Sequence, residues 1–329
     1  MIRPPHADAF KDARHGRERV LTESGSNAPG IEPAIFDLAA GTALRVEAAA
    51  DALRPIFSTY WVFDSDGTTW PGAQNIVLPG WAKIWIGLTT DPLDVKVGSR
   101  RYPSLARAVL FGPTSRAVPV TSFGGLSVVV DIGPLAWARL FAVSAVSLRD
   151  AVVPLDRLFP LAWTADLVFR IERCDRGGGL KAVLDDFFLE RLPPPHRDEG
   201  AIVQILSLLA DPGTSDLADI SARIGMDHRT LLRLTKYYFG IPPKLLSMRT
   251  RFLRGLTALI LDDASHRDDV PAGYYDVSHF IRDGKRFLGM TPRRFLALDQ
   301  QYLRAALRAR IFALGAPLAS LDRSFGQPN

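Results

Sequence analysis

The stretch DHRTLLRLTKYYFGIPPKLL at residues 227–246 returns 49 residues later as DVSHFIRDGKRFLGMTPRRF at residues 276–295. The two copies share five identical positions, which are Asp227/Asp276, Arg233/Arg282, Lys236/Lys285, Gly240/Gly289 and Pro243/Pro292. Each copy opens with an aspartate suited to a helix N-cap and closes with a glycine that can take a positive φ. A proline suited to starting the next helix follows. The repeat therefore predicts two similar short helices with defined ends.

Helical spacing separates the side chains of each copy onto two faces. In the first copy the apolar side chains share one face and are Leu231, Leu234 and Tyr238. The basic side chains share the other face and are Arg229, Arg233 and Lys236. The second copy keeps the same spacing with Ser278, Arg282 and Lys285. Such a helix, preceded by a turn at Gly225 or Gly273, is typical of a helix-turn-helix that enters a major groove of DNA.

Positive charge is concentrated in the same region. Between residues 223 and 254, eight Lys and Arg residues stand against one acid, so the segment carries +7, whereas the whole chain carries +5. Positive charge of this density favours binding to phosphates, and an exposed arginine can also pair with guanine. A plain helical bundle with solvated basic faces is the alternative interpretation of either copy alone.

At its C-terminal end the segment GYYDVSHFIRDGKRFLGMTPRRF (273–295) resembles the signature of the AraC/XylS family of bacterial transcription regulators. The resemblance covers about residues 200–298. It implies two helix-turn-helix units, joined by a long helix near 243–261, that enter successive major grooves. It also implies that Arg229 and Arg233 read bases in the first unit and that Ser278, His279 and Arg282 read them in the second. Lys236, Lys285 and Arg286 would suit contacts to the DNA backbone. The resulting candidate DNA-binding side chains are His228, Arg229, Thr230, Arg233, Lys236, Ser278, His279, Arg282, Lys285 and Arg286.

Two of these side chains have simpler interpretations. His228 opens the first helix and would equally suit a solvent-facing first turn, and His279 would equally pack against Tyr274 or Tyr275. The second unit also departs from the family pattern at Pro271, at the acids 268–269 and at Gly284, which falls in mid-helix. We therefore expect the second unit to be the weaker and more adaptable reader.

The first half of the chain shows strand patterns. Short apolar or alternating runs between residues 53 and 160 are punctuated by Gly, Pro, Asp and Ser, which indicates a β-rich, barrel-like domain. Two helices are expected to follow at 164–174 and 180–192. Aromatic residues are frequent in this half and could line a pocket for an apolar or aromatic effector, or simply form the core. They are Tyr60, Trp61, Phe63, Trp70, Trp81 and Trp85.

The composition favours a binding protein over an enzyme. None of the six histidines lies between residues 16 and 195, so a histidine-ligated metal in the β-rich half is not expected. Cys174 is the only cysteine, and neither a phosphate-binding glycine loop nor a nucleophile elbow is present. We expect no cofactor. The first residues lack the apolar core of a secretory signal and no run of about 18 apolar residues occurs, so a cytoplasmic protein without membrane contact is expected.

The expected architecture is an α+β multidomain chain, with a β-rich barrel-like domain before an all-α domain of two helix-turn-helix units. The expected segments are a flexible arm (1–45), a sensor or dimerisation domain (46–192), a Pro-rich linker (193–199), a DNA-binding domain (200–300), and a C-terminal helix with its tail (301–329). The expected function is sequence-specific transcription regulation. Its partners would be double-stranded DNA, a small-molecule effector, a second copy of the chain and RNA polymerase. The alternative is a ligand-binding or interaction protein whose DNA-binding domain is weakened and largely non-specific.

Overall fold

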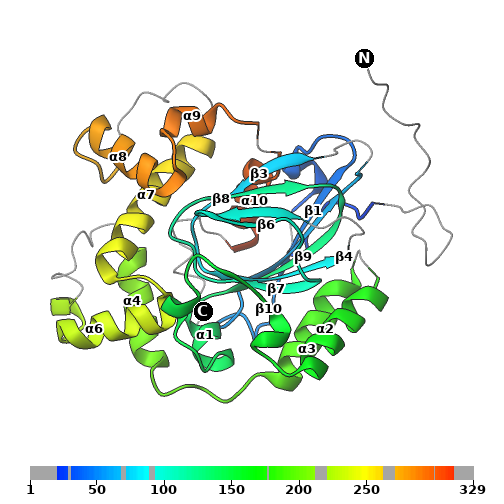
Figure 1. The fold of residues 1–329 in the computed structure, drawn as a ribbon, viewed down its shortest axis with the longest axis horizontal. Coiled ribbons are helices and arrows are strands. Elements are labelled where there is room, and N and C mark those ends of the chain that lie inside the picture. Colours follow the sequence, from blue (N-terminus) through cyan, green and yellow to red (C-terminus); the bar gives the residue numbers. More distant parts are fainter. Residues whose placement is uncertain are drawn as a thin grey trace.

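The computed structural model describes residues 21–28, 31–67, 72–88, 93–175, 178–211, 221–261, 271–299 and 301–314. A β-rich first half is followed by a helical second half, as the sequence predicts (Figure 1). Helical spacing in the sequence also predicts helices at 215–224 and 265–273, but both ranges fall mostly outside the described residues, as does Trp70.

The β-rich half consists of two antiparallel sheets. The larger sheet has the strand order β1-β2-β9-β4-β7-β10 and the smaller has the order β3-β8-β5-β6, and the described strands do not close into a barrel. The strands of the larger sheet are β1 (Thr42–Ala48), β2 (Thr59–Ser65), β4 (Ala82–Leu88), β7 (Ala108–Phe111), β9 (Gly125–Ile132) and β10 (Val152–Pro154). Those of the smaller sheet are β3 (Ala73–Val77), β5 (Asp94–Val97), β6 (Arg100–Tyr102) and β8 (Val118–Ser122).

The larger sheet is buried on both faces because successive side chains of a strand point to opposite sides. Tyr60 belongs to the core shared with helices that follow the sheets, including Leu167 and Phe188. Trp61, the next residue, belongs to the core that also contains Val95 of the smaller sheet. This two-sided burial explains why β9 is an almost continuous apolar run.

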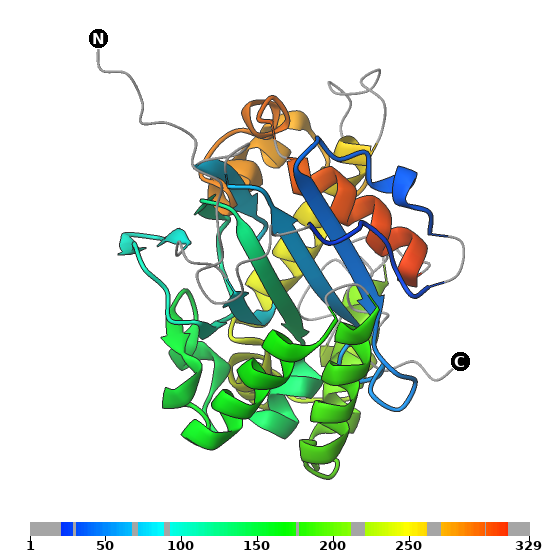
Figure 2. The same cartoon turned by 90° about the vertical axis from the view of Figure 1, so that its right-hand side faces the viewer.

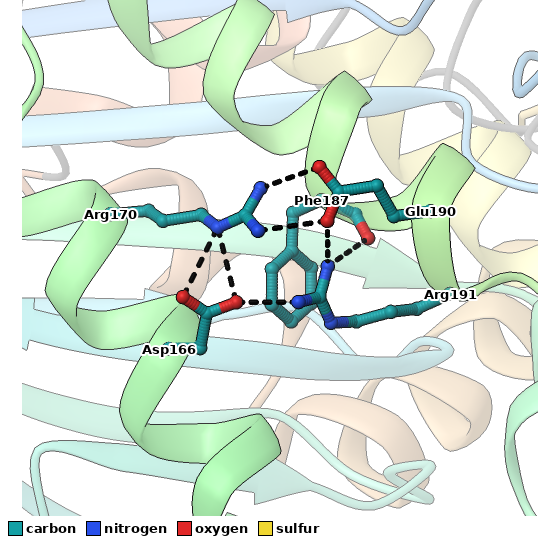
Figure 3. Close-up of polar contacts among 5 residues, drawn as sticks. All are labelled: Asp166, Arg170, Phe187, Glu190 and Arg191. Carbon is teal, nitrogen blue, oxygen red and sulfur yellow. Dashed lines mark hydrogen bonds and ion pairs between the residues drawn. The ribbon is translucent and has the colours of Figure 1, made fainter.

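Three helices cover the outer face of the larger sheet, namely α1 (Pro134–Leu140), α2 (Leu161–Arg173) and α3 (Gly179–Arg191) (Figures 1 and 2). The last two match the predicted 164–174 and 180–192. A network of ion pairs joins α2 to α3: Arg170 and Arg191 each bind both Asp166 and Glu190 (Figure 3). The Arg191 guanidinium also lies 4.3 Å from the centre of the Phe187 ring.

The helical half follows the predicted order. Its elements are α4 (Glu199–Ala210), α6 (His228–Leu234), the π-helical turn η4 (Thr235–Phe239), α7 (Pro243–Leu261), α8 (Val277–Leu288), α9 (Pro292–Leu296) and α10 (Gln301–Leu314). Helical spacing in the sequence predicts one helix over 292–309, but the structure has two helices there, α9 and α10. None of the helices within the described segments combines the length and the apolar character needed to cross a bilayer.

Both ends of the described chain pack on the sheets. Residues 21–45 were expected to form part of a flexible arm, but β1 begins at Thr42 and the Phe36 ring is buried. The short helix η1 (Pro33–Phe36) contacts α10, which in turn contacts β1. The C-terminal helix thus returns to the first half of the chain and packs beside its first strand (Figure 2).

Replacing the buried ring in the α2–α3 network should destabilise the fold. We expect Phe187→Ala to lower the free energy of unfolding by about 3–5 kcal/mol, because a fully buried phenylalanine is lost and a cavity is left. Tyr275→Ala is the control, since Tyr275 has 94% of its surface exposed. It should cost at most about 0.5 kcal/mol. Urea titration followed by circular dichroism measures both variants, and equal costs would contradict the packing described.

Candidate functional site

Helix α6, the first of the two predicted recognition helices, is fixed at both ends by residues that the sequence repeat identifies, Asp227 and Gly240. The Asp227 side chain accepts a hydrogen bond of 2.9 Å from the Thr230 backbone N–H, which is an N-cap. Hydrogen bonding from the side chain and then the backbone of Thr230 lowers the pKa of Asp227. Helix α6 continues into η4 and stops at Gly240, whose φ is +75°. A Cβ at Gly240 would also meet the Pro113 ring at 2.7 Å, so glycine is required there for two reasons.

The outer face of this helix carries the predicted side chains. His228, Arg229, Arg233 and Lys236 are exposed and Thr230 is half-buried. The charged groups of Arg229, Arg233 and Lys236 form no ion pair with any residue of the described segments. The opposite face is buried in the core through Leu231, Leu234 and Tyr238. The first helix therefore presents positive charge to solvent on one side only.

The second recognition helix, α8, repeats this arrangement. The Asp276 carboxylate accepts a hydrogen bond of 2.7 Å from the His279 backbone N–H, and Gly289 ends the helix with φ +74°. The four exposed side chains among the predicted residues are Ser278, Arg282, Lys285 and Arg286. The imidazole of His279 differs from these, because its ring lies edge-on to Tyr274 with 5.1 Å between centroids. Its Nε2 is 3.1 Å from an Arg251 nitrogen, so His279 is engaged within the protein.

Close packing, rather than looseness, accounts for the glycine in the middle of α8. A Cβ at Gly284 would lie 2.5 Å from Cδ of Pro292, the residue that starts α9. Gly255 on α7 has the same relation to Pro271, whose Cβ would lie 2.8 Å away. Gly284 is thus a point of close contact between α8 and the start of α9, and Pro271 is one between α7 and the segment that precedes α8.

A single helix joins the two recognition helices. In Figure 1, α6 and α8 lie on the same side of the molecule near opposite ends of α7. The inner face of α7 contributes Phe252 to the core that contains Phe280 and Phe287 of α8. The structure therefore holds the two helices apart on one rigid connector.

The β-rich half contacts both units. Arg249 of α7 donates a hydrogen bond of 3.2 Å to the Gly80 carbonyl, and its guanidinium lies 4.3 Å from the centre of the Trp81 ring. Tyr237 of η4, in the first unit, also contacts the β-rich half, because its hydroxyl donates a hydrogen bond of 3.0 Å to the Ala142 carbonyl. The Ala117 N–H donates to the Phe287 carbonyl of α8 at 2.7 Å. Each of the two units therefore has at least one hydrogen bond to the β-rich half.

A cavity of about 280 Å³ lies between the two sheets. Four of the predicted aromatic residues line it, namely Trp61, Phe63, Trp81 and Trp85. Tyr60 does not, because it points to the opposite face of β2, where its hydroxyl donates to Asp185 at 2.9 Å. Sequence patterns gave no signal for the charged lining residues, Lys83, Asp131 and Arg310, because they come from three distant segments.

The Asp131 carboxylate is the polar centre of the cavity wall. It accepts hydrogen bonds from Trp61 Nε1 at 2.9 Å, from Arg310 at 3.3 Å and from the Lys83 ammonium. Burial opposes its charge, but the positive charges of Lys83 and Arg310 outweigh burial and lower the pKa of Asp131 to about 2. Within the described residues, no group of three His, Cys, Asp or Glu side chains is placed to hold a metal ion.

No protein-family model and no curated protein matches the chain. Solved structures of ToxT from Vibrio cholerae are similar to it. An apo variant from strain SCE256 has 15% identity and a TM-score of 0.41, over 73% of this chain and 96% of that one. Wild-type ToxT of that strain bound to an unsaturated fatty acid has 16% identity and a TM-score of 0.38, over 69% and 91%. With values this low, the function has to be inferred from this chain's own residues.

The charge on Asp131 should make its contribution to stability depend on pH. A carboxyl with a lowered pKa stabilises the folded state above its ordinary pKa of about 4, and loses that contribution as the pH falls through its folded value. We expect Asp131→Asn to reduce the free energy of unfolding by on the order of 2 kcal/mol near pH 7. The difference from wild type should hold down to about pH 5 and shrink toward pH 2.

Urea titrations at a series of pH values measure this difference. Asp51→Asn is the control, because the Asp51 side chain is 91% exposed and should show little effect at any pH. A difference for Asp131→Asn that stays constant from pH 5 to pH 2 would contradict the assignment of charge to this carboxylate.

Proposed function

We propose that the chain is a sequence-specific DNA-binding transcription regulator whose two helix-turn-helix units read adjacent major grooves. One observation carries the proposal. Two N-capped helices, α6 and α8, are joined by α7 and expose basic side chains that make no ion pair with any described residue. A solvated bundle would not need two such faces on one connector, whereas DNA offers phosphates and guanine edges to both.

In the proposed complex the side chains have different tasks. Arg229, Arg233 and Arg282, with Ser278, would contact base edges, while Lys236, Lys285 and Arg286 would contact phosphates. His228 and Thr230 lie on the first turn of α6, where a phosphate contact is the simplest task. His279 would act mainly by fixing the first turn of α8 through Tyr274 and Arg251.

We further propose that the cavity between the sheets binds a small, mostly apolar effector. Aromatic side chains supply most of the wall. The Lys83 ammonium has three N–H donors, and the hydrogen-bond acceptor found for it among the described residues is Asp131. The indole N–H of Trp81 is buried and has no hydrogen-bond partner within the described part of the chain. An effector with one acceptor group would satisfy these donors.

The α2–α3 hairpin is our candidate dimerisation surface. Three large apolar side chains there are well exposed, Leu161 (70%), Phe169 (56%) and Leu189 (50%). A second copy of the chain would cover them, and a dimer would place four recognition helices on one DNA.

Arginine substitutions test the DNA-binding proposal. We first select bound sequences from random duplex DNA at physiological salt, and expect two enriched blocks about one helical turn apart. Arg233→Ala and Arg282→Ala should each weaken binding to the selected site about 5-fold to 100-fold and relax the sequence preference in one block. A weaker second unit, as the sequence predicts, would give the larger loss for Arg233→Ala, whereas the close packing at Gly284 favours similar losses. Arg100→Ala, an exposed arginine on β6, is the control and should bind as wild type does.

Other outcomes of this experiment are equally informative. Equal losses for the two variants would contradict the expected asymmetry between the readers. No enriched sequence, together with binding that disappears as salt rises, would replace the proposal by the alternative of a largely non-specific binder.

The effector site is tested with N-phenyl-1-naphthylamine, whose emission rises in apolar surroundings. We expect it to bind wild type and to quench the emission of the lining tryptophans. Ser127→Phe places a ring in the cavity and should weaken binding about tenfold, equivalent to about 1.4 kcal/mol. Ser104→Phe, on an exposed loop, is the matched control. No binding by wild type, or equal binding by both variants, would argue against an effector site between the sheets.

A further inference from the structure

The C-terminal helix α10 closes the open side of the two sheets. Strand β1 is an edge of the larger sheet and β3 is an edge of the smaller one, and α10 contacts both. Figure 2 shows α10 lying beside β1. The gap that a closed barrel would bridge with a strand is bridged here by a helix from the other end of the chain.

One stripe of α10 forms part of the cavity wall. Its members recur at helical spacing and are Tyr302, Leu303, Ala306, Leu307 and Arg310. The adjacent stripe, Ala305 and Ala309, packs into the core that contains Trp61 and Trp85. Because alanine buries little apolar surface, the helix is held to the sheets by a modest apolar contact.

Polar contacts fix the two ends of this stripe. The Tyr302 hydroxyl donates a hydrogen bond of 2.9 Å to the Asp64 carbonyl, and Arg310, which is 5% exposed, donates to the Asp131 carboxylate at 3.3 Å. Lys83 and Trp61 would still bind Asp131 if Arg310 moved away. Release of α10 would therefore leave no isolated buried charge on the sheet, which keeps its cost low.

The same helix is part of the core of the second recognition unit. Leu307 is almost fully buried and belongs to the cluster formed by Phe252 of α7, Phe287 of α8 and Phe295 of α9. Leu307 also lines the cavity. One turn of α10 thus connects the space between the sheets to the side of α8 that is opposite its exposed arginine.

We propose that α10 is a relay that transmits changes in the cavity to the second recognition helix. In its docked position it forms one wall of the cavity and packs against α7, and a change at the Arg310 end alters the packing of Leu307 in the cluster that contains Phe252 and Phe287. The regulatory meaning of the relay rests on the proposed function, because it would let an effector adjust one reader while the other keeps its own contacts to the sheets.

Hydrogen–deuterium exchange of the full-length protein tests the relay without DNA or effector. Arg310→Met keeps the bulk of the side chain and removes its bond to Asp131. We expect amide exchange in both α10 and α8 to rise about tenfold, with β2 and β9 unchanged. Arg304→Met is the matched control, since Arg304 is on the same helix but does not line the cavity, and should leave exchange in α8 unchanged.

Two results would overturn the relay. Faster exchange in α10 with unchanged exchange in α8 would make α10 a simple plug, and an equal response to Arg304→Met would make the effect non-specific. If Arg310→Met fails to fold, as near-ultraviolet circular dichroism would reveal, Tyr302→Phe removes a single hydroxyl and is read in the same way. Failure of wild type to bind DNA would contradict the proposed function but would leave the exchange result valid.

Discussion

Burying the Asp131 carboxylate in the middle of the larger sheet requires compensating positive charge and hydrogen-bond donors, and these come from three separate elements. Lys83 comes from the neighbouring strand, Trp61 from the strand on the other side, and Arg310 from the C-terminal helix. An isolated carboxylate there would be strongly disfavoured. The position of β9, the floor of the cavity and the docking of α10 are therefore coupled through one group.

The two halves of the chain are joined by more than a linker. The first recognition unit is held through Trp81, which contacts Phe239 and Arg249, and the second through Ala117 and α10. Trp81 and α10 both line the cavity between the sheets. Each helix-turn-helix unit therefore contacts a residue or helix that lines this cavity. Small shifts in such a space can be passed on, because packed cores change between discrete arrangements rather than deforming smoothly.

The helical repeat and most strands could be predicted from sequence because their signals are local. Caps, spacing and turn glycines predict α6, α7 and α8 to within a residue or two. The apolar or alternating runs IFSTYWVF (56–63), KIWIGLT (83–89) and LSVVVDIG (126–133) predict β2, β4 and β9. Strands β1 and β3 and helix α1 were not predicted, since their patterns are short or weakly periodic. The destination of α10 and the grouping of Lys83, Asp131 and Arg310 depend on contacts between distant segments, which no local pattern carries. The sequence alone suggests that Gly284 weakens its helix, because the contact with Pro292 that requires glycine is not visible in the local pattern.

The return of α10 to the first strand has a consequence for biosynthesis. While the ribosome is still adding the helical half, strand β3 has already emerged with its outer edge uncovered, and such an edge can pair with strands of other molecules. The space between the sheets acquires its last wall only after residue 310 has been translated. The nascent β-rich half therefore passes through an open stage in which it exposes surface that a chaperone could bind. A chain truncated just after α9 would remain in that open state.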